Sequence, residues 1–177
     1  QCPLENDANG RYEINFDRLS KTLGGQSKLL LFCNPHNPVG KVYSRDDLES
    51  IMALSVKNEI WICSDEIHSD LVYPGNRHIP IASLSKEAGQ RTATLIAPSK
   101  TYNLAGLDCS VLICENAEMM QKIKCARRGL MGGVNLLGAT AAIAAYQHGQ
   151  PWLDEVLRTL QLNRDFLSEF IASKIPG

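Results

Sequence analysis

Short, almost uninterrupted apolar stretches alternate with helical patterns along the chain. The stretches KLLLFC (28–33), NEIWIC (58–63) and TATLI (92–96) are short and nearly continuously apolar. Apolar runs of this length are typical of strands that are buried on both faces of a parallel sheet. Because such strands need helices to cover them, the pattern predicts a layered domain.

The segment between the first two predicted strands has the pattern of an amphipathic helix. Ser44 and Asp47 have the spacing of a capping box, which marks a helix start. The residues that follow form an apolar stripe at helical spacing, namely Leu48, Ile51, Met52 and Leu54. This segment and its flanking strands therefore predict a strand–helix–strand unit.

The second half of the chain predicts one further strand and three helices. We expect a strand over 109–114 and a helix over 117–128, whose cationic end suits the helix dipole. Residues 134–147 are small and apolar, as in a buried or interface helix, and residues 152–175 carry a long amphipathic pattern. The fold class predicted is α/β, with a mostly parallel sheet flanked by helices.

Composition and charge narrow the class of function. The chain has 177 residues, 44% hydrophobic residues and a net charge of −1, which gives no electrostatic preference for nucleic acid or an anionic membrane. A secretory leader and an apolar run long enough for a membrane span are absent from the sequence, so we expect a cytoplasmic location. The six cysteines lie mostly in apolar runs, which predicts reduced core thiols.

Three loops carry the candidate chemistry, because ligands of open α/β sheets bind beyond the carboxyl ends of the strands. Each loop directly follows a predicted strand, and the three read CNPHNPVG (33–40), CSDEIHSDLVY (63–73) and APSKTYNLAGL (97–107). Taken alone, each has a simple structural interpretation, such as a turn, a helix cap, a structural imidazole or a surface lysine. Together they present an amide, a carboxylate, an imidazole and an amine, which suits an aromatic aldehyde cofactor bound as a Schiff base.

Lys100 is the most informative of these side chains. It follows an apolar strand, where desolvation disfavours an unpaired ammonium group. We therefore expect either that its side chain reaches solvent or that a buried amine does chemistry.

In their order and spacing, the motifs resemble the large domain of class I/II aminotransferases, which are fold type I enzymes that depend on pyridoxal phosphate (PLP). NPHNPVG, SDEIHSDLVYPG, HIPIASLS and APSKTYNLAGL resemble the cystathionine β-lyase or carbon–sulfur lyase branch more than the transaminases. The resemblance covers essentially the whole chain. It implies that residues 1–150 are part of the PLP-binding large domain and that residues 151–177 form a long helix leading toward a small domain.

The resemblance also implies a role for each candidate residue. Lys100 would form the Schiff base and later take the Cα proton of the substrate; for both tasks burial and the nearby cofactor must lower the pKa of its amine, so that it is deprotonated. Asp65 would pair with the pyridinium nitrogen. Asn37 and His68 would donate to the phenolic oxygen, and Ser99 would contribute to the phosphate cup.

The implied reaction is α,β-elimination from a sulfur amino acid, a small-molecule substrate, releasing a thiol, pyruvate and ammonia. The alternative is transamination between an amino acid and a 2-oxo acid. We expect the full-length parent to be a homodimer that binds neither nucleic acid nor a membrane. Two departures stand out: Asp108 occupies the position where transaminases usually place a phosphate-clamping arginine, and the chain has about half the family length. We therefore expect this piece alone to be inactive or nearly so.

Two unrelated classes of protein share single features with this sequence. A helicase would explain the D-E-x-H pattern that begins at Asp65, but the segment around Lys41 lacks the glycine and the Ser or Thr of a phosphate-binding loop. A zinc site would explain the spacing of Cys33 and His36, but a second ligand pair at finger-like spacing is absent from the sequence.

Overall fold

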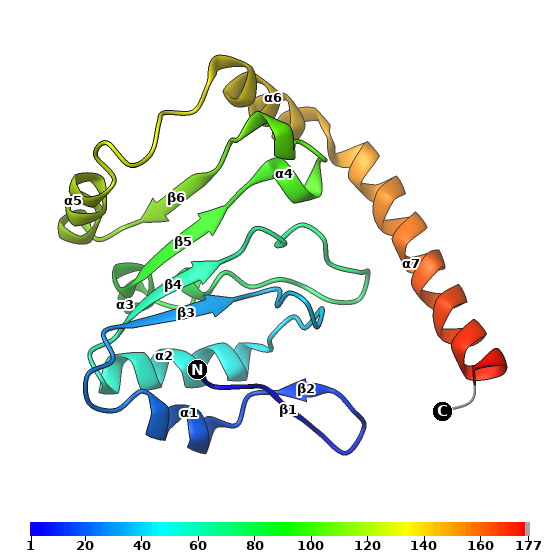
Figure 1. Cartoon of the computed structure of the whole chain (residues 1–177), viewed down its shortest axis with the longest axis horizontal. Coiled ribbons are helices and arrows are strands. Elements are labelled where there is room, and N and C mark those ends of the chain that lie inside the picture. The colour runs from blue at the N-terminus through cyan, green and yellow to red at the C-terminus, as the bar shows by residue number, and fades with distance from the viewer. Residues whose placement is uncertain (176–177) are drawn as a thin grey trace.

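The computed structural model describes residues 1–175 and contains two sheets. The larger sheet has the spatial order β3-β4-β5-β6, in which β3, β4 and β5 are parallel and β6 is antiparallel to β5 (Figure 1). The smaller one is an antiparallel pair near the N-terminus. The strands are β1 (Glu5–Asn6), β2 (Tyr12–Glu13), β3 (Leu29–Cys33), β4 (Trp61–Asp65), β5 (Thr92–Ile96) and β6 (Val111–Cys114). The predicted α/β class with a mostly parallel sheet is confirmed.

Helices connect the strands and lie around the larger sheet. The α-helices are α1 (Phe16–Thr22), α2 (Arg45–Lys57), α3 (Lys86–Arg91), α4 (Pro98–Thr101), α5 (Ala117–Ala126), α6 (Leu136–His148) and α7 (Gln150–Lys174). Two short 3-10 turns are η1 (Ile81–Ser83) and η2 (Ala105–Leu107). The predicted capping box of α2 is present, with Asp47 N donating to Ser44 Oγ at 3.1 Å and Ser44 N donating to Asp47 Oδ2 at 3.0 Å.

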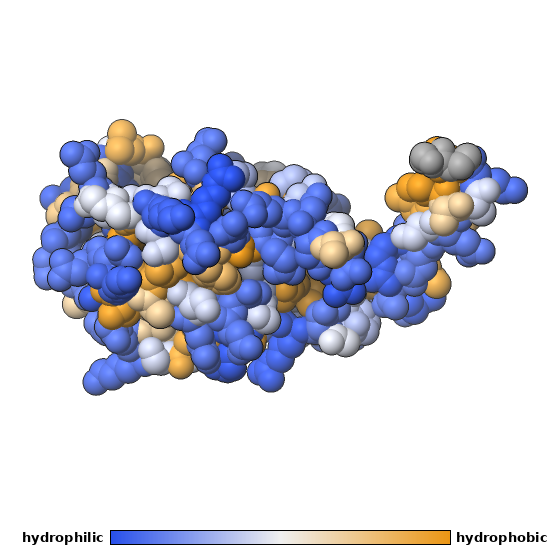
Figure 2. Space-filling model, turned by 90° about the horizontal axis from the view of Figure 1, so that it is seen from below, coloured by the Kyte–Doolittle hydropathy of each residue, from blue (hydrophilic) through white to orange (hydrophobic). Residues whose placement is uncertain are grey.

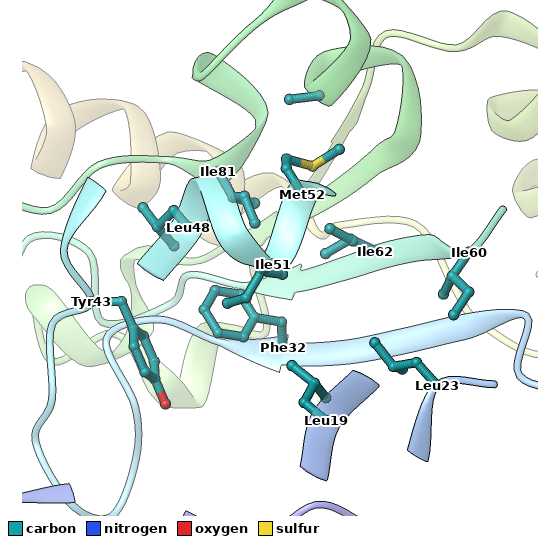
Figure 3. Packing of buried hydrophobic residues seen from close by; sticks show 11 residues of the cluster. Leu19, Leu23, Phe32, Tyr43, Leu48, Ile51, Met52, Ile60, Ile62 and Ile81 are labelled. Carbon is teal, nitrogen blue, oxygen red and sulfur yellow. The ribbon is translucent and has the colours of Figure 1, made fainter. Parts of the chain in front are cut away.

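The main core lies between one face of the sheet and helices α1 and α2. Phe32 from β3 and Ile62 from β4 face the apolar side of α2, as Figure 3 shows. Leu48 and Ile51 of α2 are almost completely excluded from solvent. Burial of such side chains is the main favourable contribution to folding, so this layer fixes the strands that carry the loops.

The parallel strands also bring their carboxyl ends to one edge of the sheet. Cys33 pairs with Asp65, and Asp65 pairs with Leu95 on the next strand. In Figure 1, β3, β4 and β5 all point toward the side of the molecule along which α7 runs. The loops that follow these strands therefore begin next to one another.

One burial expectation is wrong, and of the two alternatives for α6 only the interface helix remains. β3 is not buried on both faces, because Leu29 and Leu31 are 52% and 74% exposed while Phe32, on the opposite face, is buried. Side chains alternate between the two faces of a strand, and α1 and α2 pack on one face only. In α6, Leu136 and Leu137 are 81% and 72% exposed, so this helix is not a buried core helix in the described structure.

Helix α7 begins next to α6 and runs past the loops at the carboxyl ends of the parallel strands (Figure 1). Its far end projects from the molecule as an arm, with hydrophobic side chains gathered there (Figure 2). The exposed apolar residues there include Phe166, Leu167, Phe170 and Ile171. The helix predicted over 152–175 is thus confirmed in type and length, and the last two residues of the predicted segment 151–177 lie outside the described residues.

Candidate functional site

Asp65 ends β4 at the centre of the sheet edge. Its carboxylate is half-buried, and Oδ1 accepts from Ile67 N at 3.3 Å. Its backbone oxygen accepts from Asn34 N at 3.0 Å, which continues the pairing of β3 and β4 beyond the strands. Because the neighbouring Ser64 is buried on the core side, alternation places the Asp65 carboxylate on the opposite face of the sheet.

The two asparagines of the NPHNPVG loop have different environments. Asn34 is completely buried, and its Oδ1 accepts from Tyr43 N at 3.3 Å while Nδ2 donates to Ile79 O at 3.5 Å. Asn37 is exposed. The first asparagine thus holds the loop in place, and the second leaves its amide free for a ligand.

His68 and Asn37 line the same cavity, which has a volume of about 570 Å³. His68 lies in the turn after β4, and the far wall comes from α7. His36 also lines this cavity; burial lowers the pKa of its imidazole, and its buried Nδ1 has no hydrogen-bond partner among the described residues. The other lining residues include Pro35, Tyr73, Leu157, Leu160 and Arg164.

Ser99 and Lys100 lie on the single-turn helix α4, directly after β5. Ser99 is half-buried, whereas Lys100 is exposed, so the expectation of a buried amine is wrong for this structure. The residues of α4 that turn inward are instead Pro98 and Thr101. Of the two interpretations for Lys100, the side chain reaches solvent, which leaves its amine accessible to a ligand.

The structure brings the candidates together in part. Asn37 and His68 share one cavity, while Asp65, Ser99 and Lys100 line none of its walls. A partly buried contact links α4 to the loop that carries His68, because Thr101 Oγ1 donates to Asp70 Oδ2 at 3.4 Å. All five candidates lie at or just beyond the carboxyl ends of the adjacent parallel strands β3, β4 and β5.

The sequence predicts only core thiols at Cys33 and Cys63, which lie beside Asp65 in the sheet. Cys33 pairs with Asp65 across the strands and Cys63 precedes it by two residues, so all three side chains share one face of the sheet. Burial raises the pKa of both thiols, and the negative charge of Asp65 raises it further. All six cysteines are free, as expected, but none is fully buried.

Two observations bear on the unrelated classes. Glu66, the second acidic residue of the D-E-x-H pattern, is buried and hydrogen-bonded within the protein, so it cannot reach a nucleotide-bound magnesium ion. Within residues 1–175, His, Cys, Asp and Glu side chains nowhere gather in a group of three or more that could hold a metal ion.

None of the helices in the described chain combines the length and apolar composition that crossing a bilayer requires.

The donor set suits the aldehyde, ring nitrogen and ring oxygen of PLP. An accessible amine, a half-buried carboxylate and an exposed amide are present as Lys100, Asp65 and Asn37. The phosphate end is less well provided, because Asp108 is an exposed carboxylate at the end of η2, with a φ of 49°. Asp tolerates this left-handed conformation better than most residues. The position where the resemblance expects an arginine thus contributes no positive charge.

Comparison with known proteins places these residues in a family. Residues 2–174 match the family of class I and II aminotransferases. Cystathionine beta-lyase PatB of Bacillus subtilis is 39% identical over 175 residues, which are 98% of this chain and 45% of that protein. Protein MalY of Escherichia coli is 32% identical, with 98% of this chain and 44% of that protein covered.

A solved structure has the same fold. Cystalysin from Treponema denticola, whose crystal structure contains a pyridoxal 5'-phosphate cofactor, superimposes with a TM-score of 0.94 at 33% identity. The match covers 99% of this chain and 45% of cystalysin. The chain thus spans less than half the length of these relatives, and over that span it belongs to the family of class I and II aminotransferases, with the fold of the fold type I PLP-dependent enzymes.

Proposed function

We propose that the protein to which this sequence belongs is a PLP-dependent enzyme that removes a thiol from a sulfur amino acid by α,β-elimination. The observation that carries the proposal is that Asp65 ends β4 and Lys100 follows the adjacent parallel strand β5, while Asn37 and His68 lie in the loops that follow β3 and β4. The names of PatB and of other relatives, which are cystathionine beta-lyases, support elimination.

Each candidate residue of this chain would have a defined role in this reaction. PLP, when bound, supplies an aromatic ring that accepts the electron pair left behind when the substrate loses its Cα proton. Lys100 would bind the aldehyde carbon and then hold the Cα proton on its amine. Asp65 would face the ring nitrogen and keep it protonated. Asn37 and His68 would donate to the ring oxygen, and Ser99 to the phosphate.

Transamination is the second candidate, since the family also contains aminotransferases. Both reactions begin with removal of the same Cα proton. They differ in whether a sulfur group then leaves Cβ or a proton is added to the cofactor. A free thiol product distinguishes elimination from transamination.

The remaining proposals concern the whole protein. We propose that residues 1–150 are part of the PLP-binding domain and that α7 leads toward a second domain. A cytoplasmic homodimer that acts on a small amino acid would suit this assignment, and the exposed apolar side chains of α6, including Leu136, Leu137 and Ile143, support a contact between subunits.

The first test is covalent capture of PLP by the chain itself. We expect borohydride reduction in the presence of PLP to label Lys100, and we expect Lys100→Ala to lose this label, as measured by mass spectrometry of the digested protein. Lys57→Ala is the matched control, because Lys57 is also an exposed lysine in a helix but lies in α2, outside the site. Labelling scattered over many lysines, or unchanged in Lys100→Ala, would refute the lysine assignment. Turnover is not the readout, because we expect this chain alone to have little or none.

A further inference from the structure

Glu66 is a buried carboxylate directly beside the proposed cofactor ligand Asp65. Its exposed fraction is 1%, and among the described residues it is the only charged side chain in the fully buried class. Moving a carboxylate out of water is costly unless it is paired and hydrogen-bonded. The proposed roles of Asp65 and Lys100 do not use this group, so its burial needs another explanation.

The carboxylate of Glu66 is surrounded by hydrogen-bond donors. Ser64 Oγ donates to Oε1 at 2.7 Å, and Ile81 N donates to the same oxygen at 3.3 Å. Oε2 lies 2.8 Å from Nε2 of His78, whose side chain is only 8% exposed. The four groups join the end of β4 to the segment that leads into η1. A charged carboxylate only accepts hydrogen bonds, so Nε2 of His78 is the donor of this contact when Glu66 is ionised.

This network holds Asp65 from both sides along the chain. Ser64 and Glu66 flank Asp65, and their side chains bond to each other on the core side of the sheet. The backbone is fixed at the same point, because Asn34 N donates to Asp65 O at 3.0 Å and Glu66 N donates to Leu95 O at 2.9 Å. Because the side chains of Ser64 and Glu66 both point into the core, the Asp65 carboxylate points toward the opposite face of the sheet.

We propose that Glu66 and His78 form a buried brace that fixes the direction of the Asp65 carboxylate, so that it meets the ring nitrogen of an aromatic cofactor. Glu66 and His78 are positioning residues, since they act through Asp65 and not by touching the cofactor. The inference rests on the proposed function for its cofactor, and the brace itself is a property of the protein without any ligand.

The brace is tested first without cofactor. Glu66→Leu removes the carboxylate, and we expect the Asn34 amide, which donates to Asp65 O, to exchange about tenfold faster or more with deuterium. The Trp61 amide, which donates to Lys28 O at the opposite end of β4, should keep its rate. Glu66→Gln, which retains the hydrogen-bonding shape, should restore most of the protection.

Ser55→Ala is the matched control. Ser55 is also fully buried, and its Oγ donates to Ile60 O immediately before β4 begins. We expect this variant to destabilise the protein and to affect Trp61 rather than Asn34. If Glu66→Leu does not fold, Ser64→Ala removes one hydrogen bond of the same network and should move the same amide. Equal changes at Asn34 and Trp61 in the Glu66 or Ser64 variant, or none at Asn34, would overturn the brace.

The second test asks whether the brace orients the Asp65 carboxylate or only stabilises the fold. Dissociation constants are compared for PLP and for its carbocyclic analogue, in which C–H replaces the ring nitrogen that Asp65 would contact. We expect the preference for PLP to fall about tenfold in Glu66→Leu, as in Asp65→Asn, and to persist in Glu66→Gln and Ser55→Ala. A lower affinity for both compounds with the preference intact means a purely structural role and overturns the proposal. If the unmodified chain binds neither compound, the cofactor assignment fails for this chain, and the exchange at Asn34 still decides whether the brace exists.

Discussion

At the scale of single residues, the local environment gives chemically identical side chains different reactivities. Cys33 and Cys63 lie beside Asp65, where burial and its negative charge raise the pKa of both thiols. Cys125 lies in the exposed last turn of α5. Because the thiolate is the reactive form, these cysteines should differ in reactivity although all are free.

Alkylation kinetics test this difference. At pH 8 we expect iodoacetamide to modify Cys125 about tenfold faster or more than Cys33 and Cys63, since a higher pKa leaves less thiolate and burial limits access. Mass spectrometry of samples quenched over time gives the three rates. In urea the rates should converge, and similar rates in the folded protein would contradict the environments described here.

The sequence predicted part of this residue-scale picture. That Asp65 follows a strand could be predicted, because the apolar run and the polar residues after it are adjacent in sequence. The exposure of Lys100 could not, because in a single-turn helix the neighbouring structure decides which side chain turns inward. The role of Glu66 was also missed, because its partner His78 lies twelve residues away in the sequence. One signal could have suggested this pair: Glu66 and His78 are both titratable, and both lie between the second and third predicted strands.

At the scale of elements, local signals fixed the helices better than the packing of their faces. The α2 helix begins at the predicted cap, and its apolar stripe packs on the sheet (Figure 3). The strand over 109–114 was also predicted, but its direction was not, because the residue pattern of an edge strand is the same in either direction. The apolar pattern of α6 could not distinguish a core helix from a helix with a free surface.

The cap of α2 is a quantitative test of these local signals. We expect Ser44→Ala to lower the free energy of unfolding by about 0.5–2 kcal/mol, because it leaves the Asp47 amide without its side-chain acceptor. Urea unfolding measures this change. Ser50→Ala, at an exposed position of the same helix, is the control and should change the free energy by less than about 0.5 kcal/mol.

At the scale of the whole molecule, α7 is attached by few contacts. Near its start, the ring of Trp152 lies 6.1 Å from that of Tyr102, the second residue after Lys100. A side chain at Gly149 would come within 2.5 Å of the Tyr102 ring, so glycine allows this close approach. Farther along, the guanidinium of Arg164 lies 4.5 Å from the centre of the Tyr73 ring. These contacts hold α7 against the loops of the candidate site.

Removing the distant contact should loosen the far half of α7. A cation–π contact contributes about 0.5–1 kcal/mol at an exposed site, so we expect Arg164→Gln to speed amide exchange in residues 160–170 about two- to fivefold. Arg158→Gln is the control, because Arg158 pairs with Glu155 within the helix. Equal acceleration in both variants would mean that helix stability, and not the contact with Tyr73, controls the exchange.

The order of the sheet has a consequence for how the chain folds at high concentration. β3 and β6 are the two outer strands, and each therefore has one side without a strand partner in the described structure. On β3 this open edge coincides with the exposed side chains of Leu29 and Leu31. Unpaired backbone groups beside apolar side chains are a template for adding a strand from another molecule. Folding to the monomer is a first-order reaction, whereas association through this edge is of higher order in protein concentration. The yield of monomer on refolding should therefore fall as the protein concentration rises.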